Sequence, residues 1–225
     1  MKAITIFESQ VQGILQTFKA ADLYAIHLTS YHRGEECCNK QLISDIIEKD
    51  AVSGLTILSM FYTAAEKKAF QEKGHLVNIG NLIVLATYTA LEIYLINKFK
   101  EYFSFRVAGA SKINVSAVLD NLPHRSMDNI VELYKDILDI HLPEFEMDRI
   151  PVDPHSSFKP KSTWLGIKTI EKARHEIAHN GKSKNYKICL LPDVWDPFNF
   201  VRRWVMLFDA NFDTLIYESR TSPMV

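Results

Sequence analysis

Two chemical patterns overlap in residues 173–181, ARHEIAHNG. His175, Glu176 and His179 form H-E-x-x-H, which places two imidazoles one helical turn apart and is the signature of zinc proteases. Arg174 and His179 form R-x4-H, which joins a permanent cation to a side chain that exchanges protons near neutral pH. The first pattern needs a metal ion and the second needs none, so the rest of the sequence has to decide between them.

A catalytic zinc site normally takes a third protein ligand, and the usual spacings do not supply one here. Where metzincins place their third histidine, this chain has Asn185, and no glutamate follows the motif before Glu218. Asp193 or Asp196 could serve in principle. Three neighbouring positive charges disfavour a dication: Lys172, Arg174 and Lys182. We expect no metal, and a zinc metallopeptidase is the alternative.

Helical periodicity puts one charge on each of two apolar faces. At 100° per residue, a helix over 163–180 carries Arg174 in its apolar sector, whereas Glu176 faces the other way with the lysines. A helix over 82–103 carries Glu92 within its apolar face. Because an unpaired buried charge costs several kcal/mol or more, we expect the two helices to be neighbours and Glu92 to pair with Arg174.

The Glu92–Arg174 pair has two interpretations. A plain structural ion pair would involve no chemistry. His175 and His179, at the edge of the same helix as Arg174, favour a phosphate-handling site, in which arginine binds the anion and histidine moves protons. Two histidines near a helix C-terminus can also be simple surface residues that the helix dipole favours.

The elements that must position these residues are predicted to be helices. Ser162 or Thr163 is a plausible N-cap for the motif helix, and Gly181 a typical stop. Asp196 as N-cap and Pro197 at the first position begin the last helix.

The proline-rich stretch 141–162 is predicted to be irregular, and a short β element near 184–191 stays open. The predicted helical segments are 3–31 (one helix or two), 38–73, 78–104, 115–122, 126–140, 163–180 and 197–217. The fold class is therefore all-α, a helical bundle.

Composition is that of an ordinary soluble globular protein: 225 residues, 47% hydrophobic and 24% charged, with a net charge of −1. Without global basicity, any nucleic-acid surface must be local. Cys37, Cys38 and Cys189 do not form a disulfide framework, which indicates a reducing cytoplasm. The apolar run at 82–96 contains a glutamate and is short for a membrane span. We expect a cytoplasmic protein without a membrane segment.

The motif at the end of the predicted helix resembles the R-x4-6-H motif of the HEPN superfamily (higher eukaryotes and prokaryotes nucleotide-binding domain). In that family a polar residue typically follows the arginine, as His175 does here, and Asn180-Gly181 ends the helix. Residues 86–99, ATYTALEIYLINKF, resemble the earlier core helix that carries a polar residue, at the position of Glu92. The resemblance covers mainly residues 76–217.

The resemblance implies a bundle core of four or five helices. That core would occupy residues 76–225, with an irregular insertion at about 141–162, and residues 1–75 would be an N-terminal helical extension. Such proteins often form homodimers in which two motifs meet at the interface. Many are toxins or phage-defence effectors, so an antitoxin or a defence partner protein is a further expectation.

The implied activity is that of a metal-independent endoribonuclease without a cofactor. The RNA 2′-hydroxyl would attack the adjacent phosphate, with His179 as general acid and base and Arg174 stabilising the developing charge. His175 would assist, and Glu92 would orient Arg174. The expected RNA-binding residues are Lys172, Asn180, Lys182 and Lys184. A HEPN-like module that binds RNA or nucleotide without cutting is a second alternative.

Overall fold

The computed structural model describes residues 2–17, 75–107, 126–148, 150, 153–184, 186 and 191–221. The helices predicted at 38–73 and 115–122 lie outside this part of the chain, as does most of the connector at 184–191, where a β element had been left open. Within the described part every regular element is helical, which confirms the all-α prediction.

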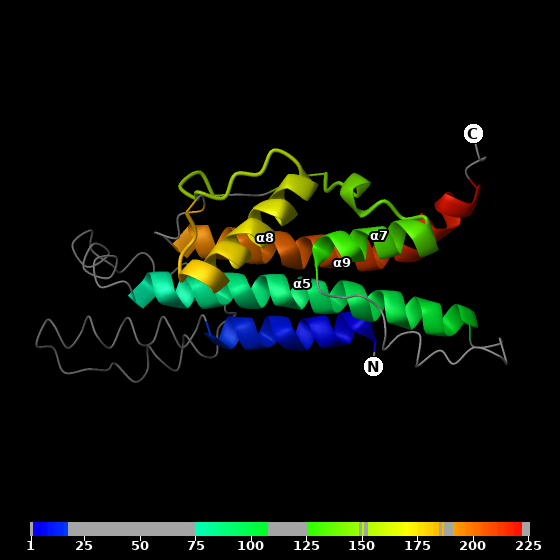
Figure 1. The fold of residues 1–225 in the computed structure, drawn as a ribbon, viewed down its shortest axis with the longest axis horizontal. Helices are drawn as coiled ribbons and strands as arrows, with labels where there is room; N and C mark the ends of the chain where they lie inside the picture. The colour runs from blue at the N-terminus through cyan, green and yellow to red at the C-terminus, as the bar shows by residue number, and fades with distance from the viewer. Residues whose placement is uncertain are drawn as a thin grey trace, which may run out of the picture.

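The described helices form an elongated bundle (Figure 1). An N-terminal helix spans residues 3–17. The remaining elements are α5 (His75–Val107), α7 (Met127–Leu138), the 3-10 turn η1 (Leu142–Glu144), α8 (Thr163–Asn180) and α9 (Leu191–Thr221).

Helix α5 is the central element, with the N-terminal helix along one side and α7, α8 and α9 along the other (Figure 1). The backbone N–H of Ala3 donates to Glu101 at 2.9 Å, and Phe7 meets Tyr94 edge to face. From the opposite layer, Tyr134 donates to the carbonyl of Leu95 at 2.7 Å. The N-terminal helix therefore packs into the same core as the motif helix.

Burial from two sides explains why α5 is apolar around most of its circumference. The segment Asn78–Phe105 has a mean hydropathy of 1.6 and is long and apolar enough to cross a membrane, but 56% of its most apolar window is buried inside the bundle. A central core helix needs the same composition as a membrane-spanning one, because apolar side chains face neighbours on both sides.

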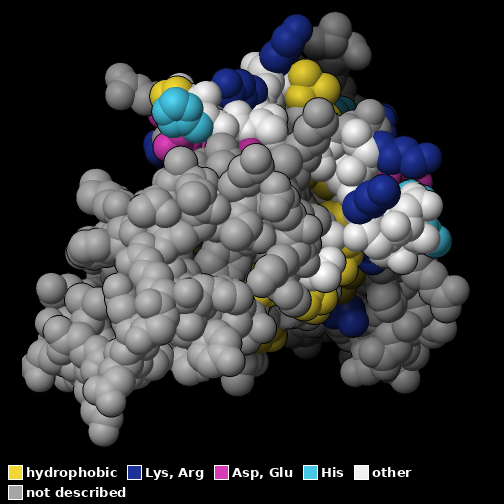
Figure 2. All heavy atoms as spheres, turned by 90° about the vertical axis from the view of Figure 1, so that its left-hand side faces the viewer, with side chains coloured by type: hydrophobic (Ala, Val, Ile, Leu, Met, Phe, Trp, Pro, Cys, Tyr) yellow, Lys and Arg dark blue, Asp and Glu magenta, His cyan; other side chains and the backbone are white. Residues whose placement is uncertain are grey.

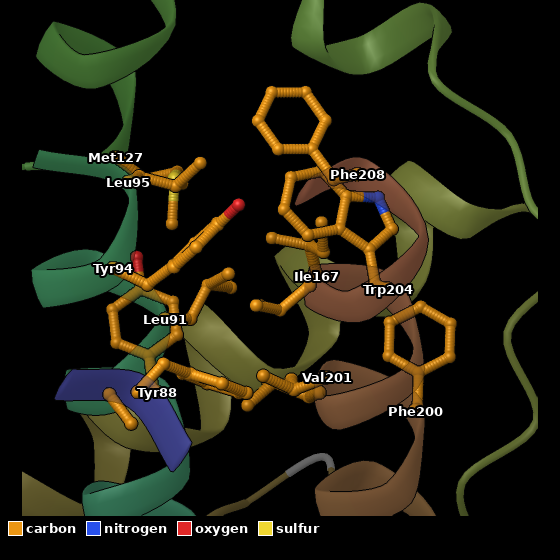
Figure 3. Close-up of a cluster of buried hydrophobic side chains, with 14 of the residues drawn as sticks. Tyr88, Leu91, Tyr94, Leu95, Met127, Ile167, Phe200, Val201, Trp204 and Phe208 are labelled. Atoms are coloured by element: carbon orange, nitrogen blue, oxygen red, sulfur yellow. The ribbon is translucent and has the colours of Figure 1, made fainter. Parts of the chain in front are cut away.

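Aromatic side chains of α9 fill the space between α5 and α8 (Figure 3). Trp204 stacks on Phe208 with ring centroids 4.9 Å apart, and both are fully buried. Figure 3 shows them facing Leu91 and Leu95 of α5, with Ile167 of α8 nearby. The face of α9 that carries Trp204 and Phe208 is thus its core face.

The motif helix begins and ends where its sequence predicts. The Ser162 hydroxyl accepts a hydrogen bond from the N–H of Leu165, as an N-cap does. Gly181 has a left-handed φ of 70°, which glycine adopts without strain, and its N–H donates to the carbonyl of Ile177 at 2.8 Å. These two signals set the exact position of the motif relative to the helix end.

The start predicted for the last helix is wrong, since α9 begins at Leu191 and Asp196 lies inside it. The Asp196 carboxylate accepts the backbone N–H of Asp153, and the Asp193 carboxylate accepts that of Ser157. Both carboxylates therefore hold the preceding irregular segment. Pro192 falls in the first turn, where a missing N–H costs nothing.

Close packing of α8 on α9 gives a stability test at Gly166. A Cβ atom at this position would overlap the ring of Phe200, which is buried and packed against Phe158 at 5.3 Å. Gly166→Ala is expected to lower the free energy of unfolding by about 1–3 kcal/mol through overpacking. Gly13→Ala is the control, because nothing lies within 4 Å of its Cβ position, and it should stabilise its helix by about 0.5–1 kcal/mol. Urea denaturation compares them, and a Gly166→Ala chain as stable as the wild type would contradict the packing.

Candidate functional site

Arg174 and Glu92 meet across the α5–α8 contact, as expected from the two helical projections. The Nη2 atom of Arg174 lies 4.0 Å from the Oε2 atom of Glu92. However, the Arg174 side chain is 39% exposed, whereas that of Glu92 is 18% exposed. The expectation that both charges lie on core-facing positions therefore holds for Glu92 but overstates the burial of Arg174.

The partial exposure of Arg174 follows from the line along which α8 packs. The buried residues of this helix are Thr163, Gly166, Ile167, Ile170, Ala173 and Ile177. Arg174 lies toward one edge of that line, and Ala178, one turn farther along the same edge, is exposed. The guanidinium is thus fixed on its inner side and open to solvent on its outer side.

Tyr88 and Glu171 belong to the surroundings of Arg174 and were not singled out from the sequence. The Arg174 guanidinium carbon lies 5.7 Å from the centre of the Tyr88 ring, within the range of cation–π attraction. The Tyr88 hydroxyl donates to Glu171. A signal for Tyr88 was available, because it stands one helical turn before Glu92 on the same face of α5.

A chain of charges continues from Glu171 away from Arg174. Lys168 Nζ lies 2.8 Å from Glu171 Oε2 and 2.6 Å from Asp128 Oδ1 at the start of α7. This network joins α5, α7 and α8 through paired groups. Glu171 thus has two partners, Lys168 and the Tyr88 hydroxyl. These contacts hold in place the Tyr88 ring that lies near the Arg174 guanidinium.

Burial is the largest influence on the pKa values of Glu92 and Tyr88, the titratable groups next to Arg174. It raises the pKa of Glu92 above its usual value, and the charge of Glu171 adds to this, although the Arg174 guanidinium opposes it. Burial likewise raises the pKa of Tyr88 far above that of a free phenol, with Glu171 and Glu92 reinforcing the effect. Tyr88 therefore stays protonated, and its hydroxyl can donate to Glu171.

His175 and His179 lie side by side on the last two turns of α8. Both are exposed, and their ring centroids are 4.4 Å apart with the planes inclined by 51°. The helix end beneath them is anchored to α5, because the Asn81 side chain donates to the carbonyl of Gly181 at 2.8 Å. Asn81 is 6% exposed, and sequence reasoning had given it no role.

Glu176, the residue between the two histidines, anchors the loop that follows the helix. Its Oε2 atom accepts hydrogen bonds from the Ser183 hydroxyl at 2.6 Å and from the N–H of Lys184 at 2.7 Å. A zinc peptidase would need this carboxylate beside the metal-bound water. Here it is engaged in holding the 181–184 turn against α8.

The described residues contain no group of three His, Cys, Asp or Glu side chains placed to hold a metal ion. Asp193 and Asp196, which the sequence left as candidate third ligands, hold the backbone of the irregular segment instead. The alternative of a zinc peptidase thus gains no support from the geometry.

The four predicted RNA-binding residues, Lys172, Asn180, Lys182 and Lys184, are all exposed. Asn180, Lys182 and Lys184 come after the histidines at the end of α8, and Lys172 lies about one turn before His175. Figure 2 looks onto the end of the bundle that lies at the left in Figure 1, and its described part shows lysine and arginine side chains together with histidine. Acidic side chains lie among them in the same view, so the basic residues near the histidines are Lys172, Lys182 and Lys184 rather than a uniformly basic face.

Arg174 and His179 do not share one face of α8. Five positions separate them, which corresponds to about 140° around the helix axis and about 7.5 Å along it. Glu92 of α5 and Arg174 of α8 form an ion pair between two helices, whereas the rings of His175 and His179 are neighbours on α8. The two residues of R-x4-H therefore leave the helix on different sides.

The raised pKa of Glu92 makes a pH-dependent stability test. A folded-state value above the unfolded one means that the stability contributed by this group is fully present below the unfolded value and is lost as pH rises through the folded one. Glu92→Gln cannot ionise, so its stability relative to the wild type should be higher at about pH 7 than at about pH 4. Urea denaturation at both pH values measures this, and the reverse trend would mean that attraction to Arg174 outweighs burial.

Comparison with known proteins does not identify a family for this chain. No family model matches this sequence, no curated protein sequence matches it, and no solved structure matches its fold.

Proposed function

We propose that this protein is a metal-independent endoribonuclease of the HEPN type. The observation that carries the proposal is the placement of Arg174, which is held by Glu92 at 4.0 Å and by the Tyr88 ring yet remains 39% exposed. A guanidinium that is fixed by its inner contacts and open on its outer side is suited to bind a phosphate group. The exposed histidine pair follows on the same helix.

The proposed reaction needs only side chains of this site and the substrate. The 2′-hydroxyl attacks the adjacent phosphorus, its proton passes to one histidine, and the bond to the 5′-oxygen breaks as that oxygen receives a proton. His179 provides this acid–base chemistry with the help of His175. Arg174 stabilises the charge on the pentacovalent phosphate, and the nearby lysines follow the RNA backbone.

The angular separation of Arg174 and His179 favours a site built by two copies of the chain. Within one helix the two side chains point about 140° apart, so one chain presents them to different sides of a phosphate. In a homodimer with two facing motifs, the arginine of one copy can meet the histidine of the other. We propose this arrangement, a cytoplasmic location and the role of a toxin or defence effector with a partner protein as parts of the same hypothesis.

RNA cleavage in EDTA should depend on both halves of the motif. His179→Ala is expected to lower the rate by about 10²–10⁴-fold, and Arg174→Ala by about 10²–10³-fold. Glu176→Gln is the control, because an amide oxygen can still accept from Ser183 and Lys184, and the RNase activity should persist. Gel assays on RNA, with the deoxy oligonucleotide as an uncleavable analogue, measure these rates.

Four results, from this assay and from peptidase and growth assays, separate the competing functions. Full activity in His179→Ala and Arg174→Ala would reject the proposal. Binding of RNA without cleavage by the wild type would favour a non-catalytic module. Peptidase activity that disappears in EDTA and in Glu176→Gln would favour the zinc enzyme. Relief of growth inhibition by His179→Ala on expression would support a toxin.

Mixing two inactive variants tests whether the site spans two chains. If Arg174 and His179 act from different copies, a heterodimer of Arg174→Ala and His179→Ala chains has one intact site. Random exchange of subunits should then restore roughly a quarter of the wild-type rate, since half the dimers are mixed and each has one of two sites. If both groups act within one chain, mixing should restore no activity.

A further inference from the structure

The exposed histidine pair has the arrangement of a chelate for a transition-metal ion. His175 and His179 occupy positions i and i+4 of α8, with ring centroids 4.4 Å apart. Two nitrogen ligands of a tetrahedral Zn²⁺ ion lie about 3.3 Å apart, given metal–nitrogen bonds of about 2.0–2.1 Å. Rings this close can bring one nitrogen each to that separation by small rotations about their side-chain bonds.

The backbone that carries the two rings is held from three directions. The N–H of Gly181 closes the helix on the carbonyl of Ile177 at 2.8 Å, and Asn81 of α5 holds the carbonyl of Gly181. Glu176 fastens the following turn through Ser183 and Lys184. A chelate on an anchored helix end loses little backbone freedom on binding, which favours affinity.

The electrostatic surroundings permit a cation despite the neighbouring arginine. The C-terminal end of a helix carries partial negative charge, and both histidines stand on the last two turns of α8. The charge of Arg174 is offset in part by Glu92 at 4.0 Å. Lys172 and Lys182 are exposed, so water and salt screen their repulsion.

The ligand set differs from that of a catalytic zinc centre. Glu176 already accepts two hydrogen bonds, and the described residues contain no group of three metal-binding side chains. An ion at this position would have two protein nitrogens, with water or an anion in its other positions. Imidazole suits zinc, copper and nickel, whereas magnesium and calcium prefer oxygen ligands.

We propose that His175 and His179 form a two-histidine binding site for a divalent transition-metal ion. Binding itself is independent of any activity. Its consequence rests on the proposed function: an ion bound to both imidazoles occupies the nitrogens that exchange protons, so it inhibits RNA cleavage reversibly. The pair then serves as catalytic group in the free chain and as metal ligand in the inhibited one.

Calorimetric titration of the untagged full chain with Ni²⁺ tests the site directly. One saturable site of the wild type should weaken by about tenfold or more in His175→Gln and in His179→Gln, because each removes half of the chelate. His155→Gln is the matched control, since His155 is exposed but lies outside α8, and its binding should equal that of the wild type. Unchanged binding in the two α8 variants, or no saturable site in the wild type, would overturn the proposal.

A Zn²⁺ titration of RNA cleavage tests the inhibitory consequence. The rate should fall over the concentration range in which Zn²⁺ binds, and EDTA should restore it. A chain that binds Ni²⁺ through both histidines but cuts no RNA would retain the metal site and refute the nuclease. A chain that cuts RNA at an unchanged rate when saturated with Zn²⁺ would refute the inhibition.

Discussion

Burial of α5 on two sides is the constraint on which the rest of the described structure depends. The N-terminal helix covers one side, and α8 and α9 cover the other (Figure 1). A helix in this position has to be apolar around most of its surface, so each polar group on it needs a partner. Tyr94 donates to Asp209, Asn81 to Gly181 and Tyr88 to Glu171, so these three polar groups of α5 find partners on neighbouring segments, whereas the buried Thr87 hydroxyl has none among the described residues.

Glu92 is a charged residue on the mostly apolar α5, and its burial costs free energy of folding. Burial raises its pKa, and a single ion pair at 4.0 Å does not cancel that effect. Replacing a partly buried ion pair by neutral groups is often neutral or stabilising, so stability alone does not account for a carboxylate here. The proposed function accounts for it, because there Glu92 would orient Arg174, and functional sites often retain destabilising groups.

The end of α8 combines a rigid support with exposed chemistry. Gly181, Asn81 and Glu176 hold the backbone, whereas His175 and His179 project into solvent. Glu176 is the residue that makes the motif look like a zinc protease, and in the folded chain it is a loop anchor. The same short motif can therefore indicate different functions, depending on which hydrogen bonds each of its side chains makes.

Periodicity and local signals alone determined the helical class, the limits of α8 and the pairing of α5 with α8. Ser162 and Gly181 are local capping signals, and a charge within an apolar face predicts a partner because burial without one is costly. Tertiary structure decided where α9 begins, because Asp193 and Asp196 bind a segment about 40 residues earlier in the chain. It also decided that Arg174 is half exposed and lies over Tyr88, since the line along which two helices touch depends on the packing of both.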